Sequence, residues 1–308
     1  MSLFKSLSKS LFTPLRASAL AALATVGLGA LTSQSAHAID IDAGDYTALP
    51  EGTNVVALYG QQAQRNSLYA RGDQVNGNYG LDSNIGVLRI IHFTKIAGYI
   101  VDPQILLPFG ELKAKGDVAP VLGKGSGVAD AIFAATVWTI NDPANRRYLG
   151  ITPFVYAPIG NYDRNKALNL GENRWKYALQ VGYIQGVSEK FTVDLAADVT
   201  AYGKNNRANT AGQSLEQNQS YQLQAFLRYD LRPGIDLRAG LSRGYSGSTK
   251  LDGVSQANTG NRVDKFQLGS SAFITPTTQV MALWGKDLTV SNGFKENSRI
   301  NVRLLQLF

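Results

Sequence analysis

The chain has no cysteine and only two histidines, His37 and His92. The absence of cysteine excludes disulfides, thiolate catalysis and cysteine-ligated metals. Because His37 lies in the leader described below, a histidine-based metal site or catalytic triad has almost no support. No residue pattern indicates a cofactor, so we expect neither a metal nor a cofactor.

Long uncharged apolar runs are also missing from most of the chain. The stretch from Ala17 to Leu31 is too short for a spanning helix, and it follows the isolated cations Lys5, Lys9 and Arg16. Ala36-His37-Ala38 then forms a small-x-small cleavage site. We interpret residues 1–38 as a cleaved Sec signal peptide and residues 39–308 as one domain. That domain can span a membrane only as a closed barrel.

Clusters of like charge are absent as well. The formal net charge is +7, but Lys and Arg form no basic run, and part of the excess lies in the signal peptide. We therefore expect no nucleic-acid partner and assign the positive balance to a barrel lumen.

What the chain does contain is period-2 alternation of apolar and polar residues, which predicts strands. The pattern predicts twelve strands, at 53–66, 84–94, 97–110, 127–140, 147–159, 172–186, 189–203, 217–231, 234–246, 261–274, 278–291 and 297–308. In 217–231, for example, Tyr221, Leu223 and Leu227 share one face, and Gln222 and Gln224 share the other. In lipid, the apolar face points outward and the polar face lines the lumen.

The connections between these strands alternate in length. Tight turns are predicted at 142–145, 187–188, 232–234 and 276–277. Longer polar segments lie at 67–83, 111–126, 160–171, 204–216, 247–260 and 292–296. Short periplasmic turns and long external loops are typical of outer-membrane barrels. The fold class predicted is therefore an all-β, antiparallel transmembrane barrel of about twelve strands in the bacterial outer membrane.

The C-terminus supports this prediction. The last strand alternates Ile300, Val302 and Leu304 with polar residues and ends at Phe308. A terminal aromatic on the apolar face is the usual ending of such a barrel, where it closes the ring and is recognised by the barrel assembly machinery. We also expect contact with outer-membrane lipid and a monomeric state.

The first four strands alternate less cleanly, because Ile85, Val87, Leu88 and Ile90 fall on both faces of 84–94. Strand 127–140 is apolar throughout. Two interpretations are open beside looser patterning: an internal segment covers these strands, or the lumen wall is apolar there and suits a hydrophobic permeant.

Two segments carry a family resemblance. One runs from Pro158, Gly160 and Tyr162 to Gly171, Asn173 and Trp175, and the other is 125–130, preceded by Leu107-Pro108-Phe109-Gly110. From about Pro50 to Phe308 the chain resembles the outer-membrane family named for the MetA pathway of phenol degradation. It departs mainly at Ile159, where a small polar residue is common. The resemblance implies a transport-type barrel associated with aromatic catabolism and no defined catalytic centre.

The rim motif, residues 158–175, also has a purely structural interpretation. Pro158 ends the fifth strand, since it cannot donate to a ladder. Gly160 and Gly171 are expected to adopt positive φ, and Trp175 to anchor at the interface. The motif either shapes the external rim or selects the permeant.

Lumen charges are the best candidates for function. The inward set is Lys176, Asp194, Asp198, Arg228, Asp230, Asp236, Arg238, Lys265, Arg299 and Arg303. We expect Lys176 to approach Asp194 or Asp198, and Arg228 to approach Asp236. These pairs either brace the wall or line a path, whereas Arg299 and Arg303 form an anion-attracting stripe suited to an aromatic carboxylate or phenolate.

The functional prediction is passive uptake of small hydrophobic or aromatic solutes, and the alternative is a sealed structural or binding barrel acting through its loops. Bulky inward side chains would favour a sealed barrel, whereas small ones such as Gly182, Gly240 and Gly269 favour a path; both kinds occur, so the sequence leaves the choice open. An enzyme is not expected, because a barrel phospholipase needs His and Ser two apart near the outer leaflet, whereas His92 precedes Phe93 and Thr94.

Overall fold

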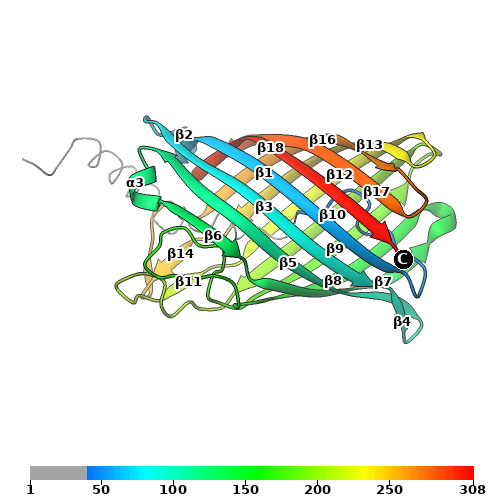
Figure 1. Ribbon diagram of the computed structural model, residues 1–308, viewed down its shortest axis with the longest axis horizontal. Coiled ribbons are helices and arrows are strands. Elements are labelled where there is room, and N and C mark those ends of the chain that lie inside the picture. Colours follow the sequence, from blue (N-terminus) through cyan, green and yellow to red (C-terminus); the bar gives the residue numbers. More distant parts are fainter. Residues whose placement is uncertain (1–39) are drawn as a thin grey trace, which may run out of the picture.

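The computed structural model describes residues 40–308, which form one closed antiparallel β-barrel (Figure 1). Twelve strands form its wall, and pairing of the last strand with the first closes the ring. The predicted fold class is confirmed. The predicted signal peptide, 1–38, and Ile39 lie outside the described residues. Within the described residues, no helix is long and apolar enough to cross a membrane.

The wall strands follow one another around the ring in chain order. They are β1 (Asn54–Ala70), β3 (Tyr79–His92), β5 (Tyr99–Gly116), β7 (Ala131–Asp142), β8 (Arg147–Ala157), β9 (Lys176–Gly186), β10 (Phe191–Tyr202), β12 (Ser220–Arg232), β13 (Ile235–Ser246), β16 (Asn261–Phe273), β17 (Thr278–Val290) and β18 (Gly293–Leu307). Each overlaps one strand predicted from the sequence.

Shorter elements belong to the connections. They are β2 (Asp73–Gln74), β4 (Thr94–Ile96), α3 (Ala119–Leu122), β6 (Lys124–Val128), the 3-10 turn η2 (Pro143–Asn145), β11 (Leu215–Gln217), β14 (Thr249–Leu251) and β15 (Val254–Ser255). β6 extends the wall by pairing with the outer half of β5, while β11, β14 and β15 form a small separate sheet.

The alternation of long and short connections fails at one place. The segment 292–296 was expected to be an external loop, but β17 ends at Val290 and β18 begins at Gly293. The connection is therefore a tight turn, and Gly293 has a φ of 101°, in the region that favours glycine. Asn292 secures the turn by donating its backbone N–H to Asn261 Oδ1 at 2.9 Å.

The outward and inward faces follow the predicted alternation. On β12, Tyr221, Leu223 and Leu227 are exposed, whereas Gln222 and Gln224 are buried. An apolar face turned outward, with a polar face turned inward, suits a barrel surrounded by lipid.

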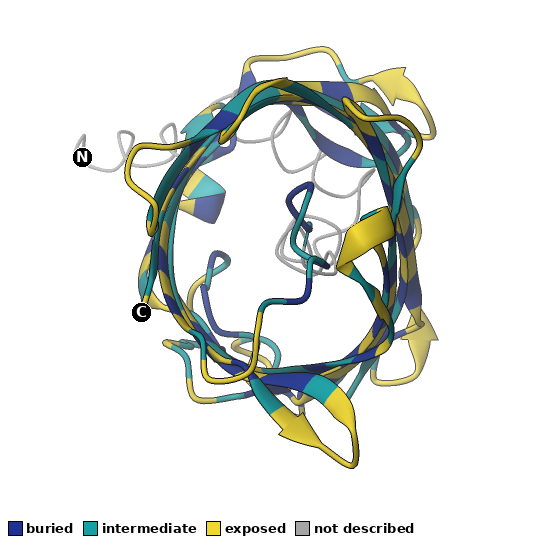
Figure 2. Cartoon of the chain, turned by 90° about the vertical axis from the view of Figure 1, so that its right-hand side faces the viewer, coloured by how far each residue is buried: buried dark blue, intermediate teal, exposed yellow. Residues whose placement is uncertain are grey.

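The lumen is not empty, because the chain before β1 enters it. Figure 2 shows segments of the described chain inside the ring of strands. Residues 40–49, which we call the plug, bury Ile41, Ala43 and Tyr46 in a cluster that includes Trp138 of β7 and Phe93, which directly follows β3. The sequence left open that an internal segment covers the first strands but did not indicate which one, because residues 40–49 carry no strand or helix periodicity.

Candidate functional site

A cavity of about 330 Å³, which we call the lumen chamber, lies inside the barrel. The plug lines one side of it with Asp40, Asp42 and Asp45, and Leu168 and Leu170 of the rim motif also line it. The chamber is therefore enclosed between a segment from the N-terminal end of the described chain and a loop from its middle.

One wall of the chamber is apolar. Ile85 and Val87 of β3, Leu106 of β5 and Ile132 of β7 line it, and Leu106 and Ile132 belong to one buried apolar cluster. Both interpretations of the irregular first strands therefore hold, at different levels. The lumen wall is apolar at the chamber, and the plug covers Trp138 of β7, whose indole N–H donates to Tyr46 O at 2.9 Å.

The facing wall is charged. Arg65 of β1 pairs with Glu296 of β18 at 2.5 Å, and Lys265 of β16 lies 3.6 Å from the same carboxylate. Arg299 pairs with Asp40 of the plug at 2.8 Å. Lys265 and Arg299 were assigned to the lumen from the sequence, but Arg65 and Glu296 were missed. Arg65 lay at the edge of its predicted strand, although its parity with Tyr59 and Gln61 would have placed it inside.

Ion pairs hold the plug against the wall. Arg303 contacts Asp42 at 3.2 Å and Asp45 at 2.9 Å, and Arg89 contacts Asp45 at 3.1 Å. Arg299 and Arg303, which the sequence assigned to an anion-attracting stripe, are thus both paired with plug carboxylates.

Two further contacts anchor the plug backbone. Gly44 N–H donates to Asp194 at 2.9 Å, and Arg238 donates to Ala43 O at 2.6 Å. Tyr46 adds hydrogen bonds between its hydroxyl and Thr152 and Gln180, both at 3.0 Å. Wall residues from widely separated strands therefore converge on one short segment.

Burial and charge set the protonation of the plug. Burial, together with the charge of Asp45, raises the pKa of Asp42 to about 6 against the opposing effect of Arg303. Burial also acts to raise the pKa of Asp45, but Arg89 and Arg303 outweigh it and hold that pKa below its usual range. The two carboxylates therefore differ in how readily they take up a proton.

Two predicted pairings inside the lumen are wrong. Lys176 pairs with Glu172 and not with Asp194 or Asp198, because the register sets it opposite Tyr202, well beyond the level of Asp198. Arg228 pairs with Asp194 at 2.9 Å and not with Asp236. Asp194 and Asp236 are both diagonal neighbours of Arg228, but Asp236 already accepts two hydrogen bonds from Arg238.

The other predicted lumen charges are also engaged. Asp198 accepts a hydrogen bond from Gln180 at 3.3 Å. Asp230 pairs with Arg146 at 3.1 Å, where its side chain is 47% exposed. Lys176 lies over the ring of Tyr156, with its Nζ 4.4 Å from the centroid, so it contributes to the edge of the chamber.

The inward glycines do not mark a path. A Cβ on Gly182 would lie 2.1 Å from the Tyr46 ring, and a Cβ on Gly240 would lie 2.4 Å from the Phe226 ring. At Gly269 the neighbouring backbone fills the space. These glycines make room for aromatic rings and close backbone packing, so they do not favour an open path.

The rim motif forms a hydrogen-bonded frame. The Asp130 carboxylate accepts the backbone N–H groups of Gly160 and Glu172, at 3.0 and 2.9 Å. The hydroxyl of Tyr162 donates to Arg207 O at 2.9 Å, and Asn173 donates to Asn205 at 3.0 Å. Pro158 directly follows the end of β8, as predicted. The motif residues build the frame, and Leu168 and Leu170 between them face the chamber.

The glycines of the motif serve close approach and not positive φ. A Cβ on Gly160 would lie 2.5 Å from the Ala129 carbonyl carbon, and one on Gly171 would lie 2.8 Å from that of Gly160. The left-handed residue of the motif is Asn173, with a φ of 53°. Trp175 is exposed on the outer face and stacks on Tyr177, as an interfacial anchor would.

The chain end closes the barrel. Phe308 donates its N–H to Asn54 O at 2.9 Å and accepts from Asn54 N at 3.1 Å, while its side chain is exposed. His92 lies nearby, exposed, with Nδ1 2.8 Å from Asn54 Oδ1.

A closed barrel of twelve strands, apolar outside and polar inside, is a bacterial outer-membrane protein. The family described as "Putative MetA-pathway of phenol degradation" matches residues 61–304, and the chain belongs to this family.

Solved structures agree with this assignment. An outer-membrane channel from Pseudomonas putida F1 is 38% identical, with a TM-score of 0.84, over 87% of this chain and 100% of that one. The β domain of the Bordetella autotransporter BrkA shares the fold alone, at 9% identity and a TM-score of 0.52, over 84% of this chain and 100% of that one. No protein with a curated description matches the chain in sequence.

Proposed function

We propose that the protein is a passive outer-membrane channel that admits small hydrophobic or aromatic solutes. The observation that carries the proposal is the lumen chamber, in which the apolar wall of β3, β5 and β7 faces the charged wall of β16, β18 and β1. Its volume of about 330 Å³ lies within the range of ligand pockets. A dry apolar cavity of about 150 Å³ is enough for benzene, so a single aromatic ring fits. The Pseudomonas putida channel supports a transport role.

The plug favours neutral solutes over anions. While Asp40, Asp42 and Asp45 occupy Arg299, Arg303 and Arg89, no guanidinium of this group is free to attract a carboxylate or phenolate. A neutral ring needs only the apolar wall. An ionised solute would have to displace the plug and take over its partners.

A sealed barrel that acts through its external loops is the second candidate, and the number of plug contacts favours it. Reconstitution into liposomes separates the two, with phenol, benzoate and a sugar of similar size as solutes. A channel passes phenol faster than the sugar, whereas a sealed barrel passes none of them. Empty liposomes correct for direct diffusion of phenol through lipid.

The proposed channel acts as a monomer and carries out no catalytic step. His92 is exposed, and its ring contacts Asn54. Closure between β18 and β1 leaves no free wall edge that another copy would pair with. The exposed Phe308 at the closing strand suits recognition by the barrel assembly machinery.

A further inference from the structure

The outer face of the barrel carries an unusual group of charges where it should face lipid. Arg243 of β13, Arg262 of β16 and Lys286 of β17 are all exposed, and all lie toward the external ends of their strands. We call these three residues the outer cation patch. One carboxylate, Asp264 of β16, lies among them.

The patch has more positive than negative charge. Asp264 accepts hydrogen bonds from Arg243 at 2.5 and 3.2 Å and from the Thr289 hydroxyl at 2.7 Å. Within residues 40–308, neither Arg262 nor Lys286 forms an ion pair with a carboxylate. A cation on the lipid face is most destabilising at the membrane midplane and less so near the interface, so the patch suits an interface that supplies anions.

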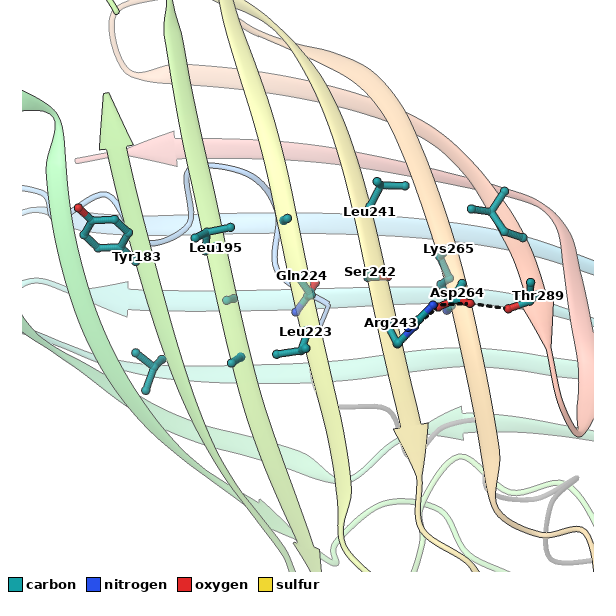
Figure 3. A pocket seen from close by; sticks show the side chains of 15 residues that line it. Tyr183, Leu195, Leu223, Gln224, Leu241, Ser242, Arg243, Asp264, Lys265 and Thr289 are labelled. Atoms are coloured by element: carbon teal, nitrogen blue, oxygen red, sulfur yellow. Dashed lines mark hydrogen bonds and ion pairs between the residues drawn. The ribbon is translucent and has the colours of Figure 1, made fainter. Parts of the chain in front are cut away.

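An apolar groove begins at the patch. It has a volume of about 810 Å³ and crosses the outer face from Arg243, Asp264 and Thr289 toward Tyr183 (Figure 3). Val181 also lines it. We call it the outer groove. The small side chains Ala197 and Ala225 line it between the larger, exposed side chains of Leu195, Leu223 and Leu241.

The strand register shows which end of the groove lies deeper. One ladder row connects Val181, Ala197, Leu223, Arg243, Asp264 and Thr289 across six strands. Thr289 is next to the last residue of β17, at the external edge, whereas Val181 lies in the middle of β9. The charged end is therefore close to the external interface, and the apolar end descends into the lipid-facing wall.

We propose that the outer cation patch and the outer groove form a binding site for a phosphorylated lipid of the outer leaflet, of the lipopolysaccharide class. The lipid phosphate pairs with Arg262 and Lys286 and adds a contact to Arg243, whose Nε and Nη2 already donate to Asp264; one acyl chain lies in the groove over Ala197 and Ala225. Phosphate is the matching ligand because it forms charge-assisted hydrogen bonds with several cations at once. The three cations and the two alanines do not line the lumen chamber, so the lipid site does not depend on what the channel transports.

The test uses the full barrel in detergent micelles with rough lipopolysaccharide, before and after enzymatic removal of its phosphates. The variant Arg243→Gln/Arg262→Gln/Lys286→Gln is compared with Lys95→Gln/Lys190→Gln/Arg232→Gln, which removes three exposed cations at the periplasmic end. We expect the first variant to raise the dissociation constant at least about tenfold and the control to leave it unchanged. Equal affinity of wild type and the first variant would overturn the proposal.

The groove is tested separately with Ala225→Phe, which fills it from the lipid side without touching the lumen. We expect this variant to bind intact lipopolysaccharide more weakly, while Ala239→Phe, on the same outer face of β13 and outside the groove lining, binds it normally. Dephosphorylated lipid should bind wild type as weakly as intact lipid binds the triple variant. If removing the phosphates had no effect, the assignment to a phosphorylated lipid would be wrong.

Discussion

Arg303 of the last strand donates a hydrogen bond to Asp45 of the plug at 2.9 Å, across 258 residues of sequence. The same guanidinium reaches Asp42 at 3.2 Å. The strand that closes the barrel therefore also contacts the segment that occupies its lumen, so plug docking is linked to barrel closure through β18.

Neutralising the plug should open the channel to anions. In Asp40→Asn/Asp45→Asn, the buried Arg89 and Arg303 lose the charge of Asp45 and Arg299 loses that of Asp40, and breaking a buried ion pair is destabilising by about 3–5 kcal/mol. The plug then leaves, and the freed guanidinium groups attract anions. We expect a several-fold rise in single-channel conductance in planar bilayers, with a shift toward anion selectivity. Glu51→Gln, an exposed carboxylate just after the plug, is the control. Unchanged conductance and selectivity would contradict this role of the ion pairs.

Tyr46 should be the main apolar anchor of the plug. Its ring lies against Gly150 and Gly182, so Tyr46→Ala leaves a cavity and removes about 3–5 kcal/mol from plug docking. Tyr46→Phe keeps the ring and loses only the hydroxyl contacts, at about 1 kcal/mol. Hydrogen exchange of the amides in residues 40–49 measures docking. Faster exchange in the Ala variant than in the Phe variant is expected, and equal rates would show that the ring does not anchor the plug.

Acidification should tighten the plug. The docked state raises the pKa of Asp42 from 3.8 to about 6 through burial and the charge of Asp45, although Arg303, Arg238 and Arg89 oppose the shift. The docked plug thus binds a proton more tightly than the released plug does. This contribution to docking is complete below about pH 4 and is lost as the pH rises through 6. Because the pKa of Asp45 is lowered, Asp45 keeps its charge over this pH range and is protonated only at lower pH.

We therefore expect wild-type conductance to fall between pH 7 and pH 5. Asp42→Asn should have low conductance at both values, because its amide mimics the protonated acid. A wild-type conductance that rises on acidification over this range would contradict the direction of the shift.

Filling the lumen chamber should block uptake without harming the barrel. Val87→Trp adds bulk to the apolar wall from inside, whereas Leu88→Trp adds the same bulk to the neighbouring position on the outer face. Phenol entry into liposomes should drop at least about tenfold for the first variant and stay near wild type for the second. Equal entry through both would mean that solutes do not pass the chamber.

Removing Asp130 should loosen the rim. Its carboxylate accepts two backbone N–H groups, from Gly160 and Glu172, and hydrogen bonds to a charged group contribute about 1.5–3 kcal/mol each. We expect Asp130→Ala to increase hydrogen exchange in residues 158–175 while the barrel keeps its resistance to heat in detergent. Asp73→Ala, at an exposed residue of β2, should change neither. An unaltered exchange rate in the Asp130 variant would mean that other contacts hold the rim.

Much of the barrel could be predicted from the sequence. Alternation along 189–203 placed Asp194 and Asp198 on the inward face, because successive strand residues point to opposite sides. The partner of each charge could not be predicted in the same way. Asp194 and Asp236 are both diagonal neighbours of Arg228, and the alternation pattern does not distinguish between them. Arg228 pairs with Asp194 because Asp236 is already bound by Arg238.

The strands, their two faces and the class of protein could be predicted without a structure, because they follow from local period-2 geometry and from turn residues. The tertiary structure alone decided the plug, the lumen chamber and the state of Arg299 and Arg303. Asp40, Asp42 and Asp45 lie in a segment without periodicity. Their partners come from β3, which pairs with β1, and from β18 at the far end of the chain. Such contacts exist only after the ring closes, since closure is what brings the first and last strands to the same side of the lumen.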